Sequence, residues 1–111
     1  MNTFKIIFIL TTLMAGIFSV KAGSDKKTIV FKVYGNCGMC KKNIETALDI
    51  KGVKSAVWNV DTKMVEVVFM PDVITEEKIH QAIAKAGYDT DLVKATDEDY
   101  KKLHTCCQYR K

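Results

Sequence analysis

The sequence has few of the ligands and motifs on which most metalloenzymes depend. It contains two histidines, four cysteines and one Cys-x-x-Cys pair. A structural zinc site normally takes four ligands. Neither a second Cys-x-x-Cys nor a His pair at zinc-finger spacing is present, so a structural zinc site is disfavoured. No Ser/His/Asp set, acid pair at active-site spacing or phosphate-binding loop accompanies the cysteines, and we therefore expect no enzymatic activity.

A strong charge of one sign is also lacking. The whole chain carries 17 basic and 13 acidic residues, a formal net charge of +4. No stripe of basic residues interleaved with aromatic ones is present, which is the pattern expected of a nucleic-acid-binding surface. These two absences argue against nucleic acid as a partner.

The first 22 residues predict a secretory signal peptide. Lys5 precedes an apolar run at residues 6–20, and small residues stand at the −3 and −1 positions of a cleavage site after Ala22. The run is shorter than the roughly 20 residues that span a bilayer, so we expect cleavage and no stable membrane insertion afterwards. The predicted mature protein is secreted, into the periplasm, with residues 23–94 as one domain and residues 95–111 as a tail.

Hydrophobic periodicity in the remaining sequence predicts an α+β fold. Apolar side chains alternate in some segments and recur at helical spacing in others. Strands are expected at residues 28–34, 53–60, 64–70 and 88–94, and helices at residues 38–50 and 76–86. The order βαββαβ is that of the ferredoxin-like sandwich, with two helices on one face of a four-stranded antiparallel sheet. His80 falls outside the apolar stripe of the second helix and is expected on the surface.

The Cys-x-x-Cys pair lies where the first strand leads into the first helix. Cys37 and Cys40 are three residues apart, so at a helix start both sulfurs lie on one face. The partial positive charge of a helix N-terminus favours thiolates, and thiolates select soft ions such as Cu(I). A redox disulfide is the alternative, because thioredoxin-like proteins place the same motif between a strand and a helix.

Residues 28–93 resemble a heavy-metal-associated domain, most visibly in the runs VYGNCGMCKKNIETAL, GVKSAVWNVDTKMVEVVF and AIAKAGY. Domains of this family occur as copper chaperones, as N-terminal modules of metal-pumping ATPases and as the periplasmic mercuric-ion carrier. The resemblance implies the βαββαβ fold and places the metal ligands at Cys37 and Cys40. It also matches Tyr88 to the loop residue that lies beside the metal in related domains.

The chain departs from the family pattern directly before the first cysteine. The family usually has Gly-Met-x there, whereas this chain has Tyr34-Gly35-Asn36. The methionine that packs beneath the metal loop is therefore missing. Met39 lies between the two cysteines instead, either as an exposed helix-start residue or as a thioether ligand.

A vicinal pair, Cys106 and Cys107, closes the tail. Neighbouring Cα atoms are about 3.8 Å apart, closer than a disulfide usually requires, so we expect these thiols to face another partner. The last strand should end at the pole opposite the metal loop, and a short tail helix that begins near Thr96 could carry the pair back. Additional metal ligands, a disulfide and inert surface thiols remain open for this pair.

The sequence thus predicts a secreted carrier of a soft metal cation. Cu(I) is the first choice, Hg(II) the second, and Zn(II) less favoured. The expected partner is a metal-transporting membrane protein or another metal-binding domain, which would receive the ion by thiolate exchange. A monomer is expected, with a metal- or disulfide-bridged dimer as the alternative. Thiol–disulfide exchange or redox sensing is the alternative function, and a structural or signalling module is the third.

Overall fold

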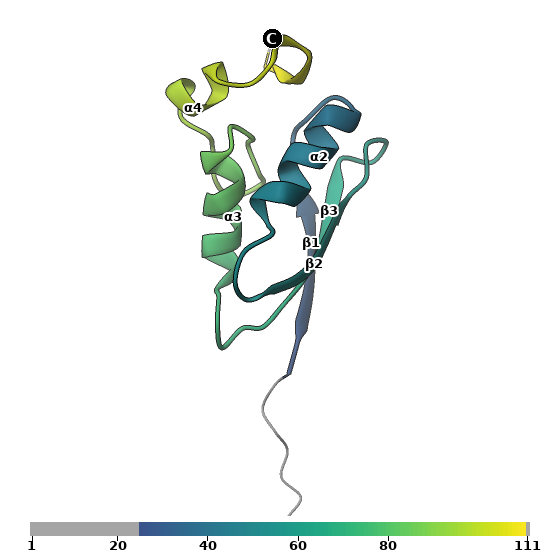
Figure 1. Cartoon of the computed structure of the whole chain (residues 1–111), viewed down its shortest axis with the longest axis vertical. Coiled ribbons are helices and arrows are strands. Elements are labelled where there is room, and N and C mark those ends of the chain that lie inside the picture. The colour runs from purple at the N-terminus through teal and green to yellow at the C-terminus, as the bar shows by residue number, and fades with distance from the viewer. Residues whose placement is uncertain (1–24, 111) are drawn as a thin grey trace, which may run out of the picture.

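The computed structural model describes residues 25–110 and shows two layers, a sheet and a pair of helices (Figure 1). The predicted signal peptide at residues 1–22 lies outside the described residues. Strands β1 (Lys27–Lys32), β2 (Val53–Trp58) and β3 (Met64–Phe69) form an antiparallel sheet in the order β1-β3-β2. Helices α2 (Gly38–Ala47) and α3 (Glu76–Lys85) cover one face of it. Among residues 25–110, no helix is long and apolar enough to cross a membrane.

The core lies between the sheet and the two helices. Val65 and Val67 of β3 are fully buried while Glu66 between them is exposed, as the alternation of a half-buried strand requires. Phe31 of β1 pairs with Val65, so both strands present apolar side chains to the helices. The helices contribute side chains at helical spacing, among them Ile44, Leu48, Ile79 and Ile83.

The expectation for His80 is wrong. Its side chain is buried, with its ring centroid 3.9 Å from that of Phe31 and its Nδ1 2.7 Å from the Thr90 hydroxyl oxygen. Burial lowers the pKa of His80, despite the opposing charges of Asp91 and Glu76. The residue lies beside the apolar stripe of α3, where β1 and the chain after α3 cover it.

The predicted last strand, residues 88–94, is reduced to one bridge between Thr90 and Val33. The Thr90 hydroxyl accepts hydrogen bonds from the backbone N–H groups of Leu92 and Val93, at 3.1 and 3.0 Å. The Thr90 N–H in turn donates to the Val93 carbonyl at 2.8 Å. A threonine side chain can replace a ladder partner in this way, so the segment turns back instead of extending along β1.

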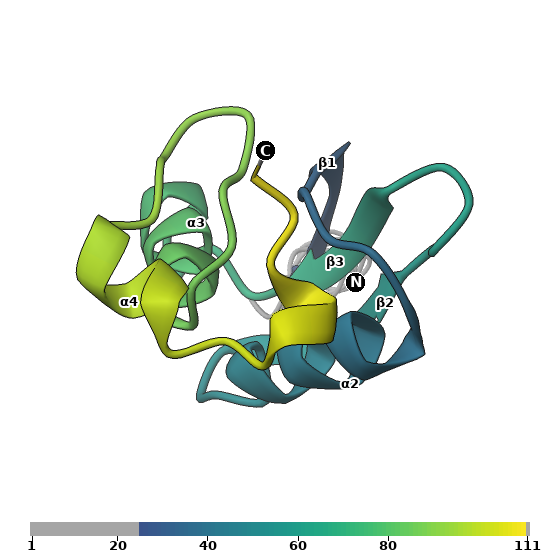
Figure 2. The same ribbon diagram turned by 90° about the horizontal axis from the view of Figure 1, so that it is seen from above.

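The expectation that the tail starts at the pole opposite the metal loop is therefore wrong. Helix α4 (Asp97–Lys101) packs beside the end of α3, and Thr96 caps it by accepting a hydrogen bond from the Asp99 N–H at 3.0 Å. The 3₁₀ turn η2 (Thr105–Cys107) follows and lies over the first turn of α2 (Figure 2). The Cys-x-x-Cys pair at the start of α2 and the vicinal cysteines of η2 thus lie at the same pole of the molecule.

Candidate metal centre

The loop between β1 and α2 places the Cys-x-x-Cys pair as the sequence predicts. Cys37 is the N-cap residue of α2, and its carbonyl accepts the first hydrogen bond of the helix, from the Lys41 N–H at 3.1 Å. Cys40 lies in the first turn of the helix with its side chain fully buried, and its sulfur accepts a hydrogen bond from the Asn36 N–H at 3.3 Å. Cys37 is half-buried. One sulfur is therefore enclosed by the domain and the other remains accessible.

Trp58 fills the space beneath this loop. A Cβ added to Gly35 would lie 3.2 Å from two atoms of the Trp58 indole and 3.2 Å from the Cβ of Cys40. The indole is fully buried, and its N–H donates to the carbonyls of Val33 at 3.0 Å and Lys63 at 3.2 Å. Gly35 is the position at which the family resemblance leads us to expect the packing methionine. The tryptophan thus supplies from β2 the apolar support that the loop itself lacks.

The tail is fastened to the domain on both sides of η2. Before η2, Leu103 packs against Gly87, whose Cβ position would lie 2.9 Å from the leucine side chain. After η2, the Tyr109 hydroxyl donates to the Gly87 carbonyl at 2.9 Å and accepts from the Asp89 N–H at 2.8 Å. The position of η2 is therefore determined by contacts with the chain that follows α3.

Arg110 adds an ion pair to this fastening. Its guanidinium donates to the Asp89 carboxylate at 2.7 and 3.3 Å and to the Ala95 carbonyl at 2.7 Å. Burial opposes ionisation of Asp89, but the Arg110 hydrogen bonds outweigh it and hold the pKa of that carboxyl below its usual value. The last described residues thus hold the tail in place.

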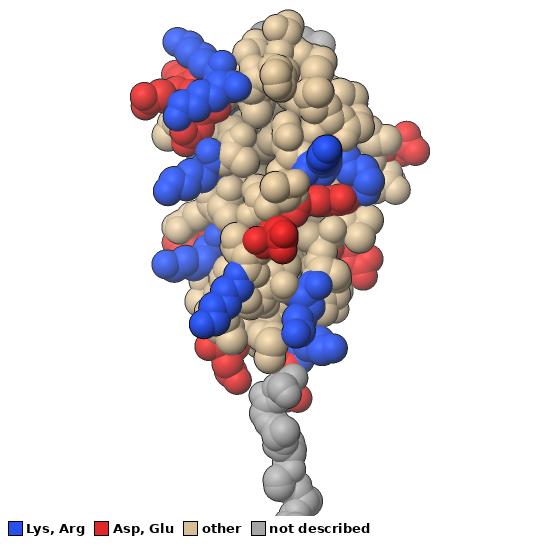
Figure 3. Space-filling model, viewed as in Figure 1, with Lys and Arg blue, Asp and Glu red and all other residues tan. Residues whose placement is uncertain are grey.

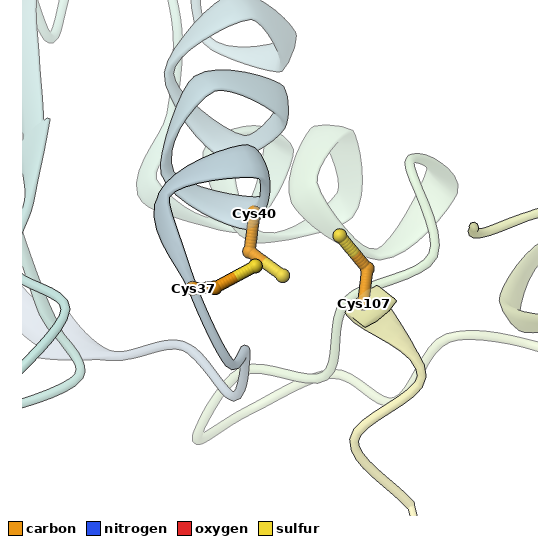
Figure 4. Close-up of side chains that lie close together, drawn as sticks. All are labelled: Cys37, Cys40 and Cys107. Carbon is orange, nitrogen blue, oxygen red and sulfur yellow. The ribbon is translucent and has the colours of Figure 1, made fainter. Parts of the chain in front are cut away.

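Three sulfurs converge at this end of the molecule. The Sγ atoms of Cys37, Cys40 and Cys107 all lie within 4.8 Å of one another (Figure 4). Cys107 is fully buried and reaches the cluster from η2, while the other two come from the start of α2. We call these three residues the thiol cluster. In residues 25–110, no other group of three or more potential His, Cys, Asp or Glu ligands lies close enough to hold an ion.

The two vicinal cysteines face different surroundings. Cys106 is exposed, and its sulfur lies 3.7 Å from that of Met39, which is itself 44% exposed. The Cys106 carbonyl accepts a hydrogen bond from the Asn36 side chain at 3.1 Å, which ties η2 to the metal loop. Of the two tail cysteines, only Cys107 joins the thiol cluster, and Met39 pairs with Cys106 outside it.

Tyr88 and Asn43 line the buried side of the thiol cluster. The Asn43 amide donates to the Tyr88 hydroxyl at 3.0 Å and lies 4.0 Å from the Cys107 sulfur. Tyr88 is fully buried, and its ring stacks on that of Tyr109 with centroids 6.0 Å apart. The sequence predicted Tyr88 here from the resemblance. Asn43 was not predicted, although its place one turn beyond Cys40 on α2 would have indicated it.

The protonation equilibria of the sulfurs differ because their surroundings differ. The backbone N–H groups of Cys40 and Met39 at the helix N-terminus hold the pKa of Cys37 below its ordinary value. Burial, together with the neighbouring Cys40 thiol, raises the pKa of Cys107 to about 12. Of Cys37 and Cys107, the accessible Cys37 is therefore the more readily ionised. Among the described residues, the surface visible around the pole that η2 occupies is uncharged in Figure 3.

Comparisons with known proteins show which family this chain is similar to. The heavy-metal-associated domain matches residues 30–89. The copper chaperone CopZ of Staphylococcus epidermidis is 37% identical over 62 residues, which cover 54% of this chain and 91% of that protein. The copper-transporting ATPase HMA5 of Oryza sativa is 33% identical over 86 residues, which are 76% of this chain but only 8% of the ATPase.

Solved structures confirm the fold class. A CopZ metallochaperone superposes with a TM-score of 0.56 at 33% identity, over 58% of this chain and 98% of that one. Oxidised MerP from Ralstonia metallidurans superposes with a TM-score of 0.57 at 25% identity, over 60% of this chain and 96% of that one. The match over residues 30–89 includes both cysteines of the Cys-x-x-Cys pair. On this evidence the chain belongs to the heavy-metal-associated domain family.

Proposed function

We propose that this protein binds a soft heavy-metal cation on the thiolates of Cys37 and Cys40 and passes it to another thiolate-bearing protein. The observation that carries the proposal is the convergence of these two sulfurs, within 4.8 Å of each other, at the N-terminus of α2. Two thiolates about 4.6 Å apart can hold a linearly coordinated ion at about 2.3 Å from each sulfur. Soft thiolate ligands favour Cu(I) over harder divalent ions.

Cu(I) is the first-choice cargo and Hg(II) the second. Several relatives are named as copper chaperones or copper-transporting ATPases, which supports copper. The likeness to MerP at 25% identity is the weaker support for mercury. Zn(II) is less favoured, because the thiol cluster offers three protein ligands in residues 25–110 where a structural zinc site takes four.

Transfer would proceed by ligand exchange without oxidation or reduction. An incoming thiolate forms a bond to the ion, and one of the bonds to Cys37 or Cys40 then breaks, so the number of metal–sulfur bonds is restored. Cys37 is the accessible sulfur of the pair, and hydrogen bonds from backbone N–H groups at the start of α2 lower its pKa. A partner would therefore approach over Cys37. Metal-transporting membrane proteins and other domains of this family are the partners of matching chemistry.

We further propose that this carrier acts as a monomer outside the cytoplasm, in the periplasm. The signal-peptide pattern at residues 1–22 supports export. Export also places the thiols in an oxidising compartment, where a bound metal would protect Cys37 and Cys40 from disulfide formation.

Competition between the protein and a Cu(I) chelator tests the proposal. We expect one tightly bound Cu(I) per reduced wild-type protein, and loss of that binding in a Cys37→Ser/Cys40→Ser variant. Cys106→Ser is the matched control, since its sulfur is exposed and outside the thiol cluster. Unchanged Cu(I) affinity in the double variant would refute the site. Oxidation of client thiols by a protein without metal affinity would favour the redox alternative.

A further inference from the structure

We infer that the C-terminal tail supplies a third metal ligand, the Cys107 thiolate, so that the protein holds its cargo on three sulfurs. The inference rests on the proposed function and adds to it a ligand that lies outside the matched residues 30–89. A carrier with such a site would retain the ion until the tail sulfur is displaced.

The positions of the sulfurs support three-fold coordination. Sulfurs placed symmetrically about one ion at about 2.3 Å lie about 4.0 Å from one another in a trigonal plane. The three Sγ atoms of the thiol cluster already lie within 4.8 Å of one another without an ion. Contraction by less than about 1 Å, within the reach of cysteine rotamers, would bring all three to the metal. No backbone rearrangement is required.

The tail holds Cys107 in a prepared position. Cys107 is two residues before Tyr109 and three before Arg110, both of which are hydrogen-bonded to the segment after α3. Leu103 anchors the other side of η2 against Gly87. Folding already orders the tail, so binding of the ion would not carry the conformational-entropy cost of ordering it. A loosely attached cysteine would have no such advantage.

The Cys107 sulfur has the surroundings of a metal ligand and not those of an exposed surface thiol. Its sulfur is fully buried beside the Tyr88 hydroxyl and the Asn43 amide, 4.0 Å from the latter. Both groups can donate hydrogen bonds to a metal-bound thiolate and orient it. The neighbouring Cys106 is exposed and lies outside the thiol cluster, with its sulfur 3.7 Å from that of Met39. The vicinal pair therefore provides one inward-facing ligand and, one residue away, a chemically identical control.

X-ray absorption at the copper edge of the Cu(I)-loaded, reduced protein counts the sulfur ligands directly. We expect three sulfurs in the wild type and in Cys106→Ser, and two in Cys107→Ser. The Cu(I) affinity of Cys107→Ser should fall by about tenfold or more, since loss of even an outer hydrogen-bonding partner of a ligand costs about that much. Cys107→Ala, with circular dichroism to verify folding, separates ligand loss from the burial of a serine hydroxyl.

Two results would overturn the third ligand. One is a wild-type protein with two sulfurs around the ion. The other is a third sulfur that disappears in Cys106→Ser and persists in Cys107→Ser. In both cases Cu(I) binding by the wild type would leave the proposed function standing. Absence of Cu(I) binding in the wild type would remove the proposed function itself, so the two failures are distinguishable.

Discussion

Replacing Trp58 with phenylalanine should destabilise the domain and loosen the metal loop. The indole is fully buried, and the atoms that a phenyl ring lacks include those closest to Gly35. Removing them leaves about 40 Å³ unfilled, which costs about 1 kcal/mol at about 24 cal/mol per Å³. The buried hydrogen bond from the indole N–H to the Val33 carbonyl, 3.0 Å long, is also lost, which costs about 1–2 kcal/mol. We therefore expect the free energy of unfolding to fall by about 2–3 kcal/mol.

Urea denaturation followed by far-ultraviolet circular dichroism measures this loss. Val57→Ala is the control, because Val57 precedes Trp58 in β2 and is 56% exposed, so it should cost less than about 0.5 kcal/mol. The reasoning fails if Trp58→Phe changes the free energy of unfolding as little as Val57→Ala does.

A double-mutant cycle with Gly35→Ala sharpens the test. In the wild type the added methyl group would lie 3.2 Å from the indole and from the Cys40 Cβ, closer than ordinary contact allows. In the Trp58→Phe background the indole contact is absent and the methyl group occupies part of the vacated space. Gly35→Ala should therefore cost less there than in the wild type, by about 1 kcal/mol. Additive costs would show that the two residues do not share this space.

Two further substitutions test how the tail is fastened. Arg110→Ala should lower the free energy of unfolding by about 1–2 kcal/mol at pH 7, because Asp89 loses its charged partner at the partly exposed tail. The folded-state pKa of Asp89 lies below its ordinary value near 3.8. The stabilisation by the ion pair is therefore present above pH 3.8 and is lost as the pH falls through the lower folded-state pKa. The difference in unfolding free energy between wild type and Arg110→Ala, measured by urea denaturation, should shrink below about pH 4. Gly87→Ala should cost about 1–3 kcal/mol by thermal denaturation, because Gly87 has φ +106° and the new methyl group would lie 2.9 Å from the Leu103 side chain.

The chain offers a matched control for each. Lys102→Ala removes a surface lysine whose Nζ lies 3.8 Å from the Asp99 carboxylate and which is 74% exposed, so it should change stability by less than about 0.5 kcal/mol at any pH. Gly38→Ala adds a methyl group that meets nothing within 4 Å, and it should not destabilise. An Arg110→Ala effect that is independent of pH, or equal costs at the two glycines, would contradict the reasoning.

Local patterns were sufficient to predict the layers of the fold and the proximity of Cys37 and Cys40. The period-two alternation of β3 and the helical spacing of Ile79 and Ile83 depend on residues close together in the chain, and both predictions are confirmed. The start of α3 is likewise local, because Thr75 caps the helix by accepting a hydrogen bond from the Lys78 N–H three residues on. Cys37 and Cys40 are brought together by one turn of helix, so their spacing alone predicted their proximity.

The wrong expectations concern residues whose environment comes from distant parts of the chain. His80 is buried because Phe31 and Thr90 cover it, which its own position on α3 does not reveal. Residues 88–94 have strand-like composition, yet the Thr90 side chain satisfies backbone N–H groups within the segment and turns it. A pattern of apolar and polar residues reveals neither the burial of His80 by distant residues nor the hydrogen bonds that the Thr90 side chain accepts.

The sequence by itself determined the family, the two helix-borne cysteines and the absence of the usual loop methionine. Only the tertiary structure decided that Trp58 of β2 occupies the space beneath Gly35 and that Cys107, not Cys106, faces the other sulfurs. The physical reason is sequence separation. Spacing predicts contacts within one turn of helix. The approach of Trp58 to Gly35 depends instead on the pairing of β2 with β3, and that of Cys107 to Cys40, 67 positions earlier, on the contacts that fasten the tail, from Leu103 to Arg110.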